Sequence, residues 1–169
     1  RTSELRLLHQ YNLGKMRSVV SAGLRYFNND MHRRQQGKGT NGSDYDLTVT
    51  GEFGRDMYYK SQSVAVSVEN MLYITPKWSV SPGFRYELGY TDMTGYISYL
   101  DPAEVPNHIE HNIPAFGINS KYILGEATSI YGGISQAYRP VLFKDIIPAS
   151  SLERANKDLE DAFGYNAEL

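Results

Sequence analysis

Arginine side chains occupy positions where they could bind an anionic ligand. His32, Arg33 and Arg34 form a short basic cluster, and single arginines stand at Arg85 and Arg139. A guanidinium group presents a planar fork of N–H donors that matches the geometry of a carboxylate. These five residues are therefore the candidate ligand-binding residues of the sequence.

Each of these arginines also has a purely structural explanation. Basic clusters in loops are usually solvated, or they pair with lipopolysaccharide or with nearby carboxylates such as those of Asp30, Asp44 and Asp46. Arg85 stands two residues from Glu87, and such a pair often serves as a wall charge without touching a ligand. Both explanations remain open at the level of the sequence.

The sequence offers little for metal binding or catalysis. His108 and His111, with Glu110 between them, could form a metal pair at i and i+3, but a third ligand is not evident. The four histidines are spread along the chain, and there are no cysteines. The sequence has neither a nucleophile elbow nor a zinc-binding His-Glu-x-x-His motif. We therefore expect no enzyme activity, no resident cofactor and no protein-bound metal.

The elements that must position these residues are long β-strands. From Trp78 to Thr91, apolar and small or polar residues alternate with a period of two. Strands of soluble proteins usually run about 5 to 6 residues, whereas a tilted strand that crosses a membrane needs about 9 to 11. The length and the two different faces of this segment favour a strand with lipid on one side and water on the other.

The same alternation recurs along the chain. Residues 62–72 and 17–27 divide in the same way into an apolar and a polar face. Further strands are expected at roughly 4–11, 112–124 and 129–138, with another that begins near Gly164. Pro82 and Pro114 interrupt the pattern, because proline cannot donate to a strand ladder.

The connections between these strands alternate between short and long. Tight turns are expected at residues 12–15, 75–77 and 125–128, and long polar loops at about 28–60, 92–111 and 140–163. An outer-membrane barrel has this asymmetry, since its periplasmic turns are short and its extracellular loops are long. The expected fold class is all-β, an antiparallel transmembrane β-barrel segment of about seven strands.

Composition supports a membrane barrel and argues against nucleic-acid binding. The chain has 14 tyrosines, which suit the aromatic girdles where a membrane barrel meets the water interface. Its formal net charge of -2 provides no field that would attract nucleic acid. The chain has no cysteines, which fits an envelope protein that crosses an oxidising compartment.

Residues 131–143, which end in Ala-Tyr-Arg-Pro-Val-Leu-Phe, resemble a late-barrel motif of TonB-dependent receptors. In that motif a strand ending in Ser-x-(Gly/Ala)-aromatic-Arg-Pro enters an extracellular loop. Residues 145–148, 151–153 and 161–166 are similar to the stretch that follows in receptors of the ferric-citrate type, and residues 113–117 are similar to the strand start before this hairpin.

The resemblance implies a barrel of about 22 strands with a plugged lumen. Such a receptor captures a ferric chelate, either ferric citrate or another siderophore, and admits it with energy from the TonB complex. Its partners would be outer-membrane lipid, the chelate and TonB, and it would lie in the outer membrane of a Gram-negative cell. In this family Arg139 would fix the loop or the plug.

Residues 1–169 are expected to be a single barrel fragment without the plug domain, because seven strands cannot close a bacterial barrel. Two other functions remain open. A passive porin or an adhesin-type barrel would share the strand pattern, and a soluble β-sandwich or calycin-like binder would have shorter strands around a dry interior.

Overall fold

The computed structural model describes residues 1–39, 48–50, 52–156 and 158–169. Its elements are β1 (Thr2–Leu13), β2 (Met16–Gln35), β3 (Lys38–Gly39), β4 (Val49–Thr50), β5 (Arg55–Thr75), β6 (Trp78–Ile97), the 3₁₀ turn η1 (Pro102–Glu104), β7 (His108–Gly125), β8 (Thr128–Arg139), α1 (Phe143–Ile146) and β9 (Ala162–Glu168). None of the helices in these ranges has the length and apolar content that crossing a membrane requires.

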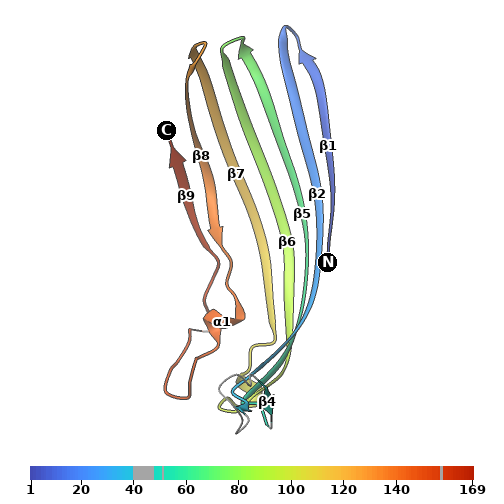
Figure 1. Cartoon of the computed structure of the whole chain (residues 1–169), viewed down its shortest axis with the longest axis vertical. Coiled ribbons are helices and arrows are strands. Elements are labelled where there is room, and N and C mark those ends of the chain that lie inside the picture. The colour runs from blue at the N-terminus through green and yellow to red at the C-terminus, as the bar shows by residue number, and fades with distance from the viewer. Residues whose placement is uncertain (40–47, 51, 157) are drawn as a thin grey trace.

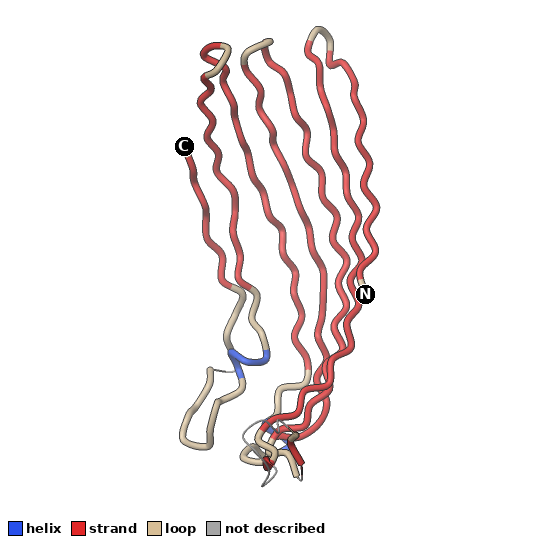
Figure 2. The backbone as a smooth tube through the Cα atoms, viewed as in Figure 1, coloured by secondary structure: helices blue, strands red, loops and turns tan. Residues whose placement is uncertain are grey.

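Seven long strands form one antiparallel sheet in the order β1-β2-β5-β6-β7-β8-β9, and β3 pairs with β4 in a separate small sheet. Each long strand therefore lies beside its neighbour in the chain (Figure 1). The tight turns at 14–15, 76–77 and 126–127 lie together at one end of the sheet, which we call the turn end (Figure 2). Gly14 has a φ of 64°, a conformation that glycine adopts without strain. The expected all-β antiparallel fold is confirmed.

We call the other end of the sheet the loop end. There the strands extend further than the sequence-based boundaries predicted. Residues 28–35 and 55–60, expected in the loop 28–60, are strand, and so are residues 92–97 and 108–111 of the loop expected at 92–111. Pairing continues to Gln35↔Arg55 and Arg55↔Ile97. The segment between β8 and β9 contains α1. Residues 40–47 and 51, which include Asp44 and Asp46, lie outside the described residues.

Alternation gives the sheet two faces of different chemistry. Leu24, Val66, Tyr86 and Pro114 are cross-strand neighbours on the outer face. Arg25, Ala65, Glu87 and Ile113 are the corresponding neighbours on the inner face. On the outer face, 44% of Val66 and 48% of Leu88 remain exposed, so the apolar residues there are not the core of a soluble sandwich.

A row of charged or titratable residues limits the apolar part of the outer face. Asp30, Lys60, Asp92 and His108 are successive cross-strand neighbours on β2, β5, β6 and β7, and we call them the charge row. Between the charge row and the turn end, Glu110, which contacts His108, is the one charged residue at the described outer positions of these four strands, and the positions beyond it carry no Asp, Glu, Lys or Arg. On each strand this uncharged band is at least as long as the roughly 9 to 11 residues that a tilted strand needs to cross a bilayer.

The polarity of the two faces inverts at the charge row. On the loop-end side of β5 and β6, most inner positions become apolar, with Met57, Tyr59, Met93 and Ile97 all buried. Outer positions there become polar, as at His32 and Thr94. The alternation thus continues with the opposite phase. This inversion explains why the strand pattern in the sequence stops near residues 60 and 91, although the backbone ladder continues.

The ladders have interruptions near both prolines. The β5–β6 register passes from Glu69↔Gly83 to Leu72↔Val80 and leaves Pro82 unpaired with β5. The β7–β8 ladder ends at Gly117↔Ser135, before it reaches Pro114. β7 and β8 therefore diverge toward the loop end (Figure 2), and β8 continues there paired with β9 alone.

The uncharged band predicts a depth-dependent cost for charge on the outer face. Val66→Arg should destabilise the full-length protein in lipid vesicles by about 2 to 4 kcal/mol, because a charged group would replace an aliphatic one near the centre of the band. Thr94→Arg, an outer position beyond the charge row, is the matched control and should change stability little. Denaturant unfolding followed by heat-modifiable migration measures both; equal losses would contradict a membrane-facing band.

Candidate functional site

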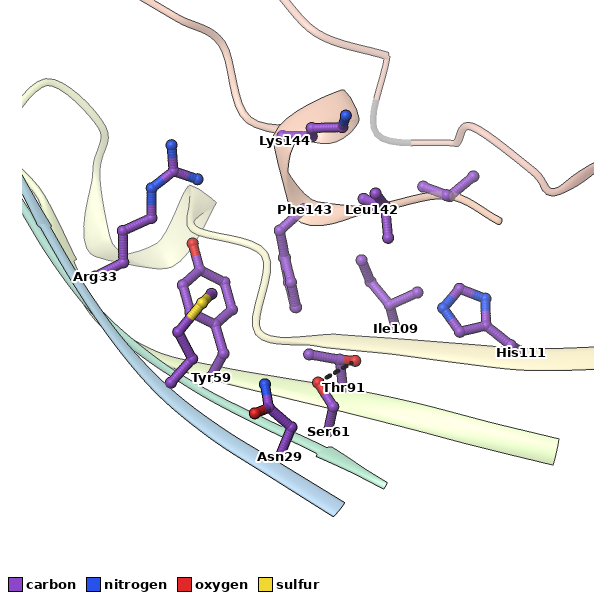
Figure 3. A pocket seen from close by; sticks show the side chains of 12 residues that line it. Asn29, Arg33, Tyr59, Ser61, Thr91, Ile109, His111, Leu142, Phe143 and Lys144 are labelled. Carbon is purple, nitrogen blue, oxygen red and sulfur yellow. Dashed lines mark hydrogen bonds between the residues drawn. The ribbon is translucent and has the colours of Figure 1, made fainter. Parts of the chain in front are cut away.

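The candidate site lies on the inner face at the loop end, where the segment between β8 and β9 folds back over the strands. Val141, Phe143, Ile146 and Ile147 of this segment are buried. They pack in one cluster with the inner-face residues Met57, Tyr59, Met93 and Ile97. This cluster fixes α1 above β5 and β6. Figure 3 shows Phe143 pointing from α1 toward the strands.

Beside this cluster is a pocket of about 230 Å³ between α1 and the strands. Its lining combines three basic side chains with aromatic, aliphatic and neutral polar ones: Asn29, Met31, Arg33, Tyr59, Ser61, Thr91, Ile109, His111, Val141, Leu142, Phe143 and Lys144. The rings of Tyr59 and Phe143 lie 5.6 Å apart and are tilted by 55°. In Figure 3, Arg33 rises from the strands beside Tyr59, and Lys144 extends from α1. The pocket can therefore hold an anionic group attached to an apolar body.

Local sequence explains why α1 starts where it does. Pro140 cannot donate to the β9 ladder, and β8 ends one residue before it, at Arg139. The Asp145 carboxylate accepts a hydrogen bond from the Leu142 N–H at 3.1 Å and one from Arg139 Nη2 at 2.8 Å. These contacts close the single turn of α1 against the end of β8.

Asp161 anchors the same segment from its other end. Its Oδ1 accepts a hydrogen bond from the Val141 N–H at 2.8 Å, and its Oδ2 lies 3.4 Å from His111 Nδ1. The side chains of His111 and Asp161 are each only 16% exposed. This contact therefore bridges the gap that opens where β7 and β8 diverge.

Tyr59 forms the floor of the pocket as a neutral phenol. Burial raises the pKa of Tyr59, and the nearby Arg33 guanidinium opposes this shift. Its hydroxyl donates to Met57 Sδ at 3.3 Å. The pocket thus has a cation, Arg33, above an uncharged aromatic surface.

The basic cluster predicted from the sequence is divided between the two faces. Arg33 lines the pocket on the inner face. His32 lies on the outer face, where its Nε2 is 2.6 Å from Asp56 Oδ1 and its ring stacks on Tyr58. The Arg34 guanidinium carbon lies 4.9 Å from the ring centroid of Phe53. Neighbouring residues of a strand point to opposite faces, so the three cannot act together.

The two remaining candidates are not in the pocket lining. Arg85 Nη2 donates to Glu87 Oε2 at 2.7 Å, and Arg25 shares that carboxylate at 3.2 Å. Arg25, Arg85 and Glu87 lie on the inner face, and they are nearer to the turn end than the pocket is. Arg139 pairs with Asp145 as described above, although 67% of its side chain is exposed. In the structure, Arg85 and Arg139 pair with carboxylates of the chain itself.

The histidines near the start of β7 also lie on opposite faces. His108 contacts Asp92 at 2.6 Å and Glu110 at 3.1 Å on the outer face, whereas His111 faces the pocket. A spacing of three brings side chains together on a helix but separates them on a strand. Within the described ranges, no group of three or more His, Asp or Glu residues is arranged to hold a metal ion.

Sequence reasoning missed Tyr59, Phe143, Lys144 and Arg55. Tyr59 and Phe143 are far apart in the chain, and no local pattern links them. Lys144 belongs to a segment that was expected to be an irregular loop. Arg55 was expected within a loop, yet its Nη2 donates to the carbonyls of Pro148 and Ala149 at 3.1 and 2.8 Å.

Known proteins resemble this chain as follows. The family model described as "TonB dependent receptor-like, beta-barrel" matches residues 1–169. The unliganded ferric citrate transporter FecA aligns with a TM-score of 0.66 and 19% identity, over 81% of this chain and 20% of that chain. The closed form of the ferric-catecholate import receptor Fiu from E. coli K12 aligns with a TM-score of 0.71 and 15% identity, over 98% of this chain and 27% of that chain.

The open form of Fiu aligns with a TM-score of 0.63 and 16% identity, over 82% of this chain and 25% of that chain. The chain thus spans less than two thirds of the length of each of these proteins. At such identities the likeness concerns the fold alone. No curated protein sequence matches the chain.

Charge pairing at the start of β7 predicts a pH dependence. Hydrogen bonds to Asp92 and Glu110 raise the pKa of His108. A raised pKa in the folded state contributes stability below the ordinary histidine pKa of about 6.5, and this contribution disappears as pH rises through the folded-state pKa. His108→Gln should therefore destabilise the full-length protein at about pH 5 and have little effect at about pH 9.

The unfolding midpoints of the wild type and of His108→Gln, compared at the two pH values, measure the contribution of His108 to stability. Asp92→Asn removes the stronger of the two partners and should abolish most of the pH dependence. A loss that is the same at both pH values would show that ionisation of His108 is not its cause.

Proposed function

Because this chain belongs to the family of TonB-dependent receptor-like β-barrels, we propose that it forms part of a receptor that imports a ferric chelate. The family consists of outer-membrane proteins of Gram-negative bacteria that transport and do not catalyse. The seven strands correspond to a portion of the barrel of such a receptor. On this proposal the outer face meets lipid and the inner face meets the lumen.

The orientation follows from the same proposal. The loop end would lie outside the cell, and the turn end would face the periplasm. The TonB complex would supply energy through a plug domain that lies outside residues 1–169, held within the lumen. The pocket beneath α1 would then lie at the outer mouth of the barrel, where the chelate arrives.

The observation that carries the proposal is the position of Arg33. Its guanidinium belongs to a pocket on the inner face, on the loop-end side of the charge row, where Lys144 is a second cation and the rest of the lining, apart from His111, is aromatic, aliphatic or neutral polar. Ferric chelates that bear carboxylates or phenolates are anionic, and a guanidinium is a suitable partner for either group. A pocket of about 230 Å³ is smaller than the usual pocket for a whole ligand, which is about 300 to 1,000 Å³. We therefore place one arm of the chelate there.

The ligand could be ferric citrate or another siderophore. FecA is a ferric citrate transporter and Fiu a ferric-catecholate import receptor. A carboxylate arm would use Arg33 with the hydroxyls of Ser61 and Thr91. A catecholate arm would in addition stack against Tyr59 and Phe143. Both classes therefore belong in the same binding experiment.

Arg33 and Arg34 provide a matched pair of variants to test the site. In the full-length receptor, Arg33→Ala should weaken binding of the recognised chelate by about tenfold, because a charge-assisted hydrogen bond is lost. Arg34→Ala, on the other face, should change affinity by less than about twofold. Equilibrium binding of ferric citrate and of a ferric catecholate measures both. Equal effects of the two variants would remove the pocket from the binding site.

A further inference from the structure

Arg55 is the first residue of β5 and faces three segments of the loop end at once. Its strand pairs with the end of β6 through Arg55↔Ile97. Arg55 Nη2 donates to the Tyr99 hydroxyl, and its guanidinium carbon lies 5.2 Å from the centroid of the Tyr99 ring. The same nitrogen donates to the carbonyl oxygens of Pro148 and Ala149. Tyr99 completes the group by donating its hydroxyl proton to the Pro148 carbonyl at 2.7 Å.

Arg55 connects the start of β5 to Tyr99 and to the backbone at Pro148 and Ala149, and we call this set of contacts the clamp. Among the described residues no carboxylate forms an ion pair with Arg55. Its charge is therefore available to strengthen hydrogen bonds to neutral carbonyls. These hydrogen bonds all come from Nη2, whose two N–H groups are shared among three oxygens. The planar guanidinium holds Nη2 in a fixed direction while its face lies near the Tyr99 ring, which a lysine ammonium cannot reproduce.

The segment that Arg55 holds needs such a clamp. α1 comprises only four residues, and a single helical turn is not stable without tertiary contacts. Asp161 fixes the segment before α1, through the Val141 N–H. Arg55 and Tyr99 fix it after α1, at Pro148 and Ala149. Phe143 and Lys144, which line the pocket, lie between these two anchors.

We propose that Arg55 is a positioning residue that joins the start of β5, the 98–107 loop and the segment between β8 and β9, and thereby fixes α1 over the pocket. The effect on ligand affinity rests on the function proposed above, but the joining of the three segments does not. Arg55 does not line the pocket, so it would act on the ligand only through the position of Phe143 and Lys144.

Distance measurement between two loops tests the clamp directly. Residues 1–169 contain no cysteine, so single cysteines at the exposed residues Ala103 and Ser151 would carry the only spin labels of this part of the receptor, with any cysteine elsewhere replaced by serine. In the full-length receptor in lipid vesicles, we expect a narrow distance distribution between these labels. Arg55→Gln should broaden it, and Arg55→Lys should give an intermediate width because lysine keeps the charge but loses the planar group that lies near Tyr99. Arg154→Gln, an exposed arginine of the same segment, is the matched control and should leave the width unchanged.

Affinity is measured on the same variants without labels, with ferric citrate and a ferric catecholate as probes. Arg55→Gln should weaken binding of the recognised chelate by about tenfold, with an unchanged global unfolding midpoint. If neither chelate binds the wild type, the proposed function fails, while the label distances still judge the clamp. An unchanged distance distribution in Arg55→Gln overturns the clamp whatever the affinities.

Tyr99→Phe keeps the test valid should Arg55→Gln fail to fold. This variant removes only the hydroxyl that receives a hydrogen bond from Arg55 and donates to Pro148. It should broaden the same distribution to a smaller degree. A distribution as narrow as that of the wild type would overturn the proposal.

Discussion

The structure depends on one constraint: in a fully paired sheet, neighbouring side chains of each strand must point to opposite faces. The residue types on one face of the sheet are therefore coupled to those on the other face. An uncharged band on the outer face leaves the polar and ionic residues, such as Arg25, Arg85 and Glu87, to the inner face. The long strands and short turns follow from the same constraint, because backbone groups inside a membrane must pair within the sheet.

At the charge row the two faces exchange their polarity. Asp30, Lys60, Asp92 and His108 succeed one another across four strands, and beyond them the apolar residues move to the inner face. The strands remain paired while their surroundings change from a bilayer to water. The inner face then has to be covered by the protein itself, and α1 with its buried Phe143 provides that cover. The pocket forms at the edge of this contact, so its position follows from the inversion.

Membership of the TonB-dependent receptor family gives these features a common purpose. A receptor wall has to be apolar toward lipid and polar toward its lumen, and it has to present a shaped surface at its mouth. The polar inner face with Arg25, Arg85 and Glu87 suits the first need, and the anchored segment around α1 suits the second. Two anchors, Asp161 on one side of α1 and Arg55 on the other, hold that surface in one arrangement.

The sequence alone determined the number of long strands, the three tight turns, the two-faced band and the family, because each rests on local periodicity or on a contiguous motif. It did not determine where the strands end, since the alternation reverses phase at the charge row and then resembles loop sequence. It also grouped His32, Arg33 and Arg34 together, although strand geometry separates them. Only the tertiary structure decided which arginine faces the pocket and that Arg55 meets Pro148 and Ala149, because those contacts join segments that are distant in the chain.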